Sequence, residues 1–198
     1  MPFLNQITNF INDVLKAGSL NNAKFQPAKY YGVATTVSRK KDSAAALEIL
    51  PAIVENGTIK NYLVPDSKLA IQLYHKMITN VYSYEKKSYG DAYSINCTSE
   101  MMLVVSFNSK LTGKAKEVLE PVVLFGLPQY LSKALTADLQ INRCLITPLS
   151  SNMDVAAVFK QEFPQADFFL NESISMFSIR YKIEMNFSQA CVDKCLCD

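Results

Sequence analysis

The stretch from Ser173 to Phe187 constrains the fold of this chain more than any other. Large apolar side chains occupy every second position and polar ones stand between them: Phe177, Ile179, Tyr181, Ile183, Met185 and Phe187 alternate with Ser178, Arg180, Lys182, Glu184 and Asn186. Because successive side chains of a strand point to opposite faces, the pattern predicts a long strand with one buried and one solvated face. Each fully buried side chain contributes roughly 1.5–3 kcal/mol, so other elements must cover this row.

Two segments have apolar residues at helical spacing and are expected to provide that cover. Leu4 to Leu15 predicts an amphipathic helix that ends near Gly18. Leu111 to Leu135 has helical character, with a break expected near Pro128 because proline does not fit a helix interior. A short third helix is predicted after a capping box from Ser151 to Asp154.

Further strands are indicated by β-branched and aromatic runs. Tyr30 to Thr36 is one, and Leu139 to Thr147 another. Asn56-Gly57 predicts a tight hairpin between Leu47–Val54 and Thr58–Val64, with Pro51 placing its strand at an edge or a bulge. The segment Lys68 to Met77 fits a strand or a helix. We interpret it as the antiparallel partner of Met101 to Phe107.

Together these elements predict an α+β fold. We expect a mostly antiparallel, twisted sheet flanked by amphipathic helices, with an extra β-hairpin. The length of 198 residues suits a single domain, 1–198, with residues 27–66 as a hairpin excursion within it.

Composition limits the functional classes. The net charge of +2 is too small to indicate sequence-specific nucleic-acid binding or an anionic membrane surface as a partner. The opening residues lack the cationic and apolar regions of a signal peptide, and no run approaches the length of a membrane span. Five cysteines without the spacing of a secreted scaffold indicate reduced thiols in a cytosol.

Candidate chemistry is sparse. Cys191, Cys195 and Cys197 could supply three thiolates to zinc, but the spacing is not that of a common zinc site. His75, the single histidine, could act as a base, yet no surrounding residues mark Cys97 or Cys144 as an activated nucleophile. Glycine-rich phosphate loops and hydrolase motifs are absent from the sequence. We therefore expect no catalytic residue, no metal ligand and no cofactor.

The centre of the tyrosine-rich stretch from Val81 to Tyr93, with Lys86, Lys87 and Gly90-Asp91, predicts a protruding hairpin tip or loop. Tyrosine is enriched at protein interfaces because it buries a large area at low entropic cost. Packing of these rings on their own hairpin is the structural alternative. The residues that we expect to reach neighbouring molecules are Tyr82, Tyr84, Lys86, Lys87, Tyr89 and Tyr93, together with Asn56 and Gly57.

The order of these elements resembles that of tail terminator proteins of long-tailed bacteriophages. The shared features are an opening helix, a strand pair with a long connection (Leu69–Met77 and Met101–Phe107), a helix from Lys114 and a closing strand of the type Ser-Ile-Arg-Tyr-Lys-Ile-Glu-Met. The resemblance covers Leu4–Leu15 and about Leu69–Phe187.

The resemblance implies a non-enzymatic virion protein, made in the bacterial host cytoplasm. Such a tail terminator or neck-ring subunit would assemble into a ring, a hexamer or higher, and would contact other neck and tail proteins of the phage. Two alternatives remain: a cytosolic α+β protein that binds a small molecule on the aromatic face of its sheet, and an enzyme that uses the cysteine cluster or His75.

Overall fold

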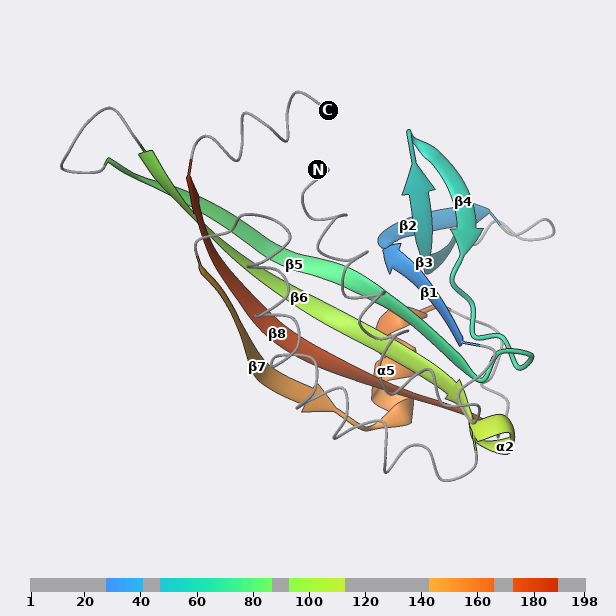
Figure 1. The fold of residues 1–198 in the computed structure, drawn as a ribbon. Helices are drawn as coiled ribbons and strands as arrows, with labels where there is room; N and C mark the ends of the chain where they lie inside the picture. Colours follow the sequence, from blue (N-terminus) through green and yellow to red (C-terminus); the bar gives the residue numbers. More distant parts are fainter. Residues whose placement is uncertain (1–27, 41–46, 87–92, 113–142, 166–172, 189–198) are drawn as a thin grey trace.

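The computed structural model describes residues 28–40, 47–86, 93–112, 143–165 and 173–188. They form two β-sheets and two short helices (Figure 1). The long sheet has the spatial order β1 (Ala28–Val33), β5 (Ile71–Lys86), β6 (Tyr93–Asn108), β8 (Ile174–Ser188), β7 (Arg143–Asn152). The small sheet has the order β2 (Thr35–Lys40), β3 (Leu47–Glu55), β4 (Thr58–Tyr62). The helices are α2 (Ser109–Thr112) and α5 (Val155–Glu162).

The expected α+β class, with amphipathic helices flanking the sheet, is wrong for this part of the chain, which is mostly β. The main reason is that β5 and β6 continue well beyond the segments predicted as strands, Lys68–Met77 and Met101–Phe107, into the tyrosine-rich stretch. They pair in register as far as Lys86 and Tyr93, and only residues 87–92 connect them outside the described ranges. The helix expected over Leu4–Leu15 lies outside the described residues, as does all of the Leu111–Leu135 helix except the two positions at the end of α2.

The closing strand is confirmed as the scaffold of the long sheet. β8 lies between β6 and β7 and pairs antiparallel with both. The apolar row from Phe177 to Met185 is buried, and Arg180 on the opposite face is exposed. Among the described strands, β1 alone runs parallel to its neighbour, β5. The predicted mostly antiparallel pairing is therefore correct.

The Asn56-Gly57 hairpin is also confirmed. It joins β3 to β4, and both turn residues have positive φ, 51° for Asn56 and 74° for Gly57, as a type I′ turn requires. Pro51 is not on an edge strand, one of its two predicted places, because β3 is central in the small sheet. A bulge, the other predicted place, lies nearby, since the register between β3 and β4 shifts between Ile53 and Val54. The Pro51 carbonyl accepts a hydrogen bond from the Leu63 backbone N–H at 2.9 Å, just beyond the end of β4.

Gly57→Ala is expected to destabilise the protein by about 1 kcal/mol, because a side chain with Cβ is strained at positive φ. An added Cβ would meet no atom within 4 Å, so the effect isolates backbone strain from steric overlap. Urea unfolding measures the change, with the exposed Thr58→Ala as control. An unchanged midpoint would show that the turn adopts another geometry at no cost.

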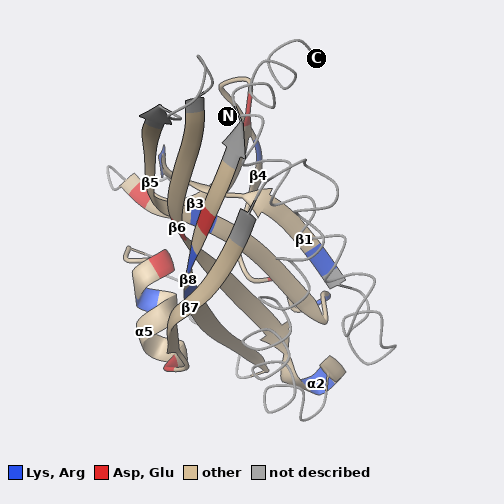
Figure 2. Ribbon diagram, turned by 60° about the vertical axis from the view of Figure 1, so that its left-hand side comes forward, with Lys and Arg blue, Asp and Glu red and all other residues tan. Residues whose placement is uncertain are grey.

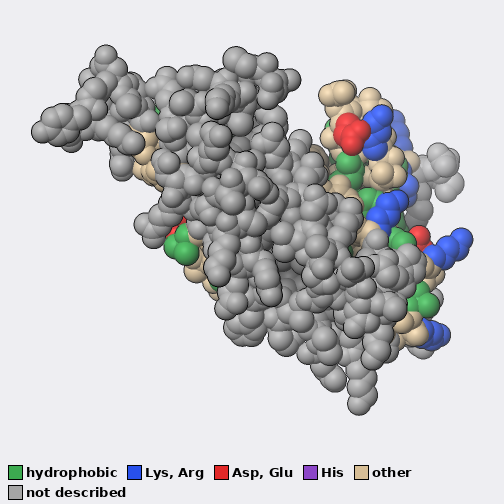
Figure 3. Space-filling model, viewed as in Figure 1, with side chains coloured by type: hydrophobic (Ala, Val, Ile, Leu, Met, Phe, Trp, Pro, Cys, Tyr) green, Lys and Arg blue, Asp and Glu red, His purple; other side chains and the backbone are tan. Residues whose placement is uncertain are grey.

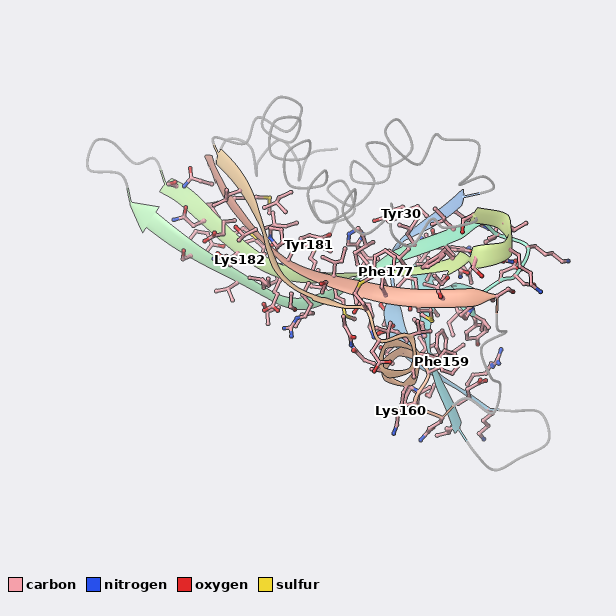
Figure 4. All side chains as sticks on the ribbon, turned by 90° about the horizontal axis from the view of Figure 1, so that it is seen from below. Tyr30, Phe159, Lys160, Phe177, Tyr181 and Lys182 are labelled. Atoms are coloured by element: carbon pink, nitrogen blue, oxygen red, sulfur yellow. The ribbon has the colours of Figure 1, made fainter. Side chains whose placement is uncertain are left out.

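An apolar cluster of the described residues lies between the long sheet, α5 and the small sheet, and Figure 4 shows α5 beneath the long sheet with Phe159 and Lys160. Its buried members are Ala34, Leu50, Ile53, Leu63, Tyr74, Met102, Val104, Val158, Phe163 and Met176. α5 and the small sheet cover this face of the long sheet, so Met102 and Val104 are buried. Leu103 and Val105, on the opposite face, are buried as well.

A buried ion pair closes one side of this cluster. The Glu162 carboxylate, whose side chain is fully buried, accepts a hydrogen bond from the Tyr74 hydroxyl at 2.9 Å. Lys76 Nζ lies 3.1 and 3.2 Å from the two carboxylate oxygens. Burial raises the pKa of Tyr74 well above its usual value, and the Glu162 charge and hydrogen bond raise it further, so the phenol remains a donor.

The short helix before Pro164 is confirmed as α5, but its cap differs from the prediction. Ser151 belongs to β7, and Asp154 is the N-cap, with its carboxylate accepting from the backbone N–H groups of Ala156 and Ala157 at 3.0 and 3.1 Å. Asp154→Ala is therefore expected to lower the free energy of unfolding by about 1 kcal/mol. Asp154→Asn, which keeps an acceptor, should lose much less in the same thermal-unfolding experiment. Equal losses would contradict a capping role.

Candidate protein–protein interface on the β5 edge

β5 is an edge strand over most of its length. β1 pairs only with the segment from Ile71 to His75, so from Lys76 to Lys86 the outer side of β5 borders no other described strand. Figure 1 shows this half of β5 running with β6 to the upper left. Outward-pointing N–H and C=O groups on such an edge can pair with a strand of another chain. We call Lys76–Lys86 the β5 free edge.

The β5 free edge also exposes large apolar side chains. Tyr84 is 70% exposed and Val81 is 60% exposed, and Ile78 and Tyr82 are exposed to a lesser degree. Long edges that expose apolar residues are uncommon in monomeric proteins, because they promote association. The β5 free edge therefore has both backbone groups and side chains suited to a partner.

A β-bulge separates this edge from the first half of β5. The register with β6 shifts between Met77 and Thr79, which leaves Ile78 as the extra residue. Beyond the bulge, Tyr82 pairs with Cys97 and Tyr84 with Ile95, so both rings share a face with those residues. The bulge thus turns the tyrosines onto the face that carries the apolar row of β8.

A polar network fixes the start of the β5 free edge. Asn80 Oδ1 accepts from Ser99 Oγ at 2.8 Å and from Cys97 Sγ at 3.3 Å. Asn80 Nδ2 donates to Tyr82 Oη at 3.0 Å. These bonds link β5 to β6 and orient Tyr82. Burial raises the pKa of the Cys97 thiol, which disfavours the reactive thiolate.

The structure brings only some of the predicted interface residues together. Tyr82 and Tyr84 lie on the β5 free edge, and Lys86 pairs with Tyr93 at the end of the ladder. The side chains of Lys86 and Tyr93 are outside the described part, as are Lys87 and Tyr89 entirely. Asn56 and Gly57 are exposed but belong to the small sheet, far from this edge in Figure 1.

His75 is a fully buried residue on the sheet face that carries the apolar row of β8, the same face as Tyr82 and Tyr84. Its Nδ1 lies 2.5 Å from Tyr30 Oη, and its ring makes an edge contact with Tyr181. Burial lowers its pKa to about 3, so the imidazole is neutral at physiological pH. His75 pairs with Leu103, six positions along β6 from Cys97 and thus roughly 20 Å away. The two residues therefore do not form a catalytic pair.

The remaining candidates do not converge on one place. Cys191, Cys195 and Cys197 lie outside the described residues. Lys and Arg side chains gather over the small sheet (Figure 3). There Arg39 pairs with Glu48 at 2.6 Å and lies 4.8 Å from the centre of the Tyr62 ring. This cation therefore has a structural role within the small sheet.

Within the ranges that the structure describes, the helices are too short to cross a membrane. Comparisons with family models and with curated proteins find no match to this sequence.

Proposed function

We propose that the chain is a non-enzymatic structural subunit of a bacteriophage virion, a tail terminator or neck-ring component, and that it self-associates. The observation that carries the proposal is the β5 free edge, where Val81 and Tyr84 are exposed and no described strand lies on the outer side. The order-of-elements resemblance supplies the virion context, the ring, and the other neck and tail proteins as partners. Self-association is the part that the β5 free edge supports directly.

A second support is that hydrogen bonds fix the position of the β5 free edge where it begins. The Asn80–Ser99–Cys97 network and the long ladder between β5 and β6 hold the strand without a partner. A preorganised edge loses less entropy on association than a mobile loop would. The alternative that places a ligand on the aromatic face of the sheet is not favoured, because Phe177 and Tyr181 are buried.

The experiment that tests the proposal measures oligomeric state over a concentration series, by sedimentation velocity and negative-stain microscopy, with and without purified tail tubes. The wild-type chain should form rings or cap the tubes. Val81→Lys places a charge on the β5 free edge and should abolish assembly. Ala157→Lys, on the exposed side of α5, is the matched control and should assemble normally.

The same experiment assigns the second predicted contact. Ile59→Lys changes an exposed residue of β4, close to the Asn56-Gly57 turn. Loss of assembly in this variant would place the small sheet in the interface as well. A wild-type chain that stays monomeric and does not bind tubes would overturn the proposal, as would unchanged assembly of Val81→Lys.

A further inference from the structure

We infer that a cavity between α5 and the long sheet is a binding site for a small organic anion. The cavity has a volume of about 570 Å³, which is within the range of small-molecule sites. Residues of β5, β6, β7, β8 and α5 line it. Lys76, Met77 and Ile78 at the start of the β5 free edge belong to the lining, but the inference does not depend on the proposed assembly.

The floor of the cavity is a single row across the sheet. Lys76 pairs with Met102, Met102 with Arg180, and Arg180 with Ser150, so the four residues are register neighbours on one face. Neighbouring strands are about 4.8 Å apart, which places the Cα atoms of Lys76 and Arg180 about 10 Å apart. Two cations therefore flank the apolar side chain of Met102.

The hydrogen-bond donors of the two lining cations favour an anion. Lys76 and Arg180 are lining residues, and no described carboxylate is among the others. Lys76 pairs with Glu162 and Arg180 with Glu100, and both acids lie outside the lining. An ammonium has three N–H donors and a guanidinium has five, so one carboxylate does not exhaust either cation. The remaining donors are available to a negatively charged oxygen.

α5 contributes a polar group opposite this floor. Gln161, an exposed residue of the helix, has its Nε2 3.5 Å from Met102 Sδ. A thioether sulfur is a weak acceptor, so a ligand oxygen would be a better partner for the Gln161 amide. Figure 2 shows α5 beside β7 and β8, where it covers this part of the sheet.

Two β-bulges provide an independent indication of a site. The register shifts between Met77 and Thr79 on β5 and between Pro148 and Ser150 on β7. Both bulges adjoin the row that contains Lys76 and Ser150, at its two ends. Bulges are over-represented beside functional sites, where they redirect side chains and end regular pairing. The two bulges lie at the same level of one sheet, at the two ends of the row that contains Met102.

The chemistry of the cavity identifies the class of ligand. A carboxylate or phosphate ester can receive charge-assisted hydrogen bonds from Lys76 and Arg180. A short apolar portion of the same molecule would pack against Met102. The ligand class is therefore a small organic anion with an aliphatic or aromatic part.

NMR titration of the full chain tests the inference. Phenyl phosphate and benzoate are added to the ¹⁵N-labelled protein, with benzyl alcohol as the neutral probe. The anions should give saturable shifts of the Met102, Ser150 and Gln161 amides, and benzyl alcohol should give much smaller ones. Arg180→Gln removes one charge-assisted bond and should weaken binding about tenfold. Gln161→Glu adds a negative charge and should weaken it to a similar degree.

Lys182→Gln is the matched control, because Lys182 is the next residue on the same face of β8 and does not line the cavity. Its affinity for phenyl phosphate should equal that of the wild type. Circular dichroism confirms that each variant is folded. The inference is overturned if the anions produce no saturable shifts, if Arg180→Gln binds normally, or if Lys182→Gln weakens binding equally.

Discussion

Lys76→Met is expected to lower the free energy of unfolding by about 3 kcal/mol, because it removes the cation from a buried carboxylate. Glu162 is fully buried, and its only other described partner is the Tyr74 hydroxyl. Breaking a buried pair typically costs roughly 3–5 kcal/mol. We expect the lower end of that range because the Lys76 side chain is 20% exposed, so water reaches one side of the pair.

A double-mutant cycle separates this effect from lost packing. Glu162→Gln can still accept from Tyr74, and the Lys76→Met/Glu162→Gln variant contains no unpaired buried charge. We expect the double variant to be more stable than Lys76→Met alone, with a coupling energy of about 2 kcal/mol in urea unfolding. Additive losses would show that the pair does not interact.

Lys182→Met provides the matched comparison on the same sheet face. Lys182 Nζ lies 3.1 Å from a Glu184 oxygen, but the side chains are 36% and 41% exposed. Exposed pairs of this kind contribute about 0–1 kcal/mol. The stability of this variant should therefore stay close to that of the wild type, although the same atoms are removed.

The closing strand and the Asn56-Gly57 hairpin could be predicted from sequence because each carries a local signal. β8 alternates from Phe177 to Met185, and this apolar row faces one way, whereas Ile174 and Met176 at the start of the strand are buried on the opposite face. The hairpin depends on two adjacent residues that tolerate positive φ. Neither prediction needs information about distant parts of the chain.

β5 could not be predicted in full because a bulge breaks its alternation. Leu73 and His75 face one side at odd positions, whereas beyond Ile78 the even-numbered Tyr82 and Tyr84 face that side. A pattern of strict period two ends at such a shift, so the predicted strand stops at Met77 although β5 continues to Lys86. The bulge between Pro148 and Ser150 has the same effect on β7, which continues to Asn152.

The candidate interface was accessible to sequence reasoning only through composition. Tyrosines were expected to reach neighbours, and Tyr84 is exposed, but the open backbone edge beside it depends on β1 ending its pairing at His75. The ion pair was not accessible at all, since Lys76 and Glu162 are 86 residues apart in sequence. Such contacts arise from the packing of α5 on the sheet, which no local pattern specifies.

Lowering the pH from 7 to 5 is expected to remove about 2 kcal/mol of stability through His75 alone. The folded pKa is about 3, below the ordinary value of 6.5, because burial disfavours the imidazolium. As the pH falls below 6.5, His75 binds a proton in the unfolded chain but stays neutral in the folded chain. The contribution of neutral His75 is therefore complete above pH 6.5 and is lost progressively toward pH 3.

The surroundings of His75 explain why protonation is unfavourable. The side chain is fully buried, with Tyr30 at Nδ1 and the Tyr181 ring 5.6 Å away between centroids. In the described structure, neither His75 Nε2 nor the Tyr181 hydroxyl has a hydrogen-bond partner. No described group around the ring carries the negative charge that an imidazolium would need. Protonation would leave a buried charge without compensation.

The single histidine makes the test direct. Its Hε1 resonance is the only one of its kind in a proton NMR spectrum, and in the folded protein it should not titrate between pH 7 and 5. Urea unfolding at the two pH values measures the loss of stability, and carboxylates of ordinary pKa, near 4, contribute little in that window. His75→Gln should show a much smaller loss between pH 7 and 5, whatever its stability at pH 7. A folded-state titration near pH 6.5, or an equal pH dependence in His75→Gln, would mean that the imidazole is accessible to solvent or paired with an anion.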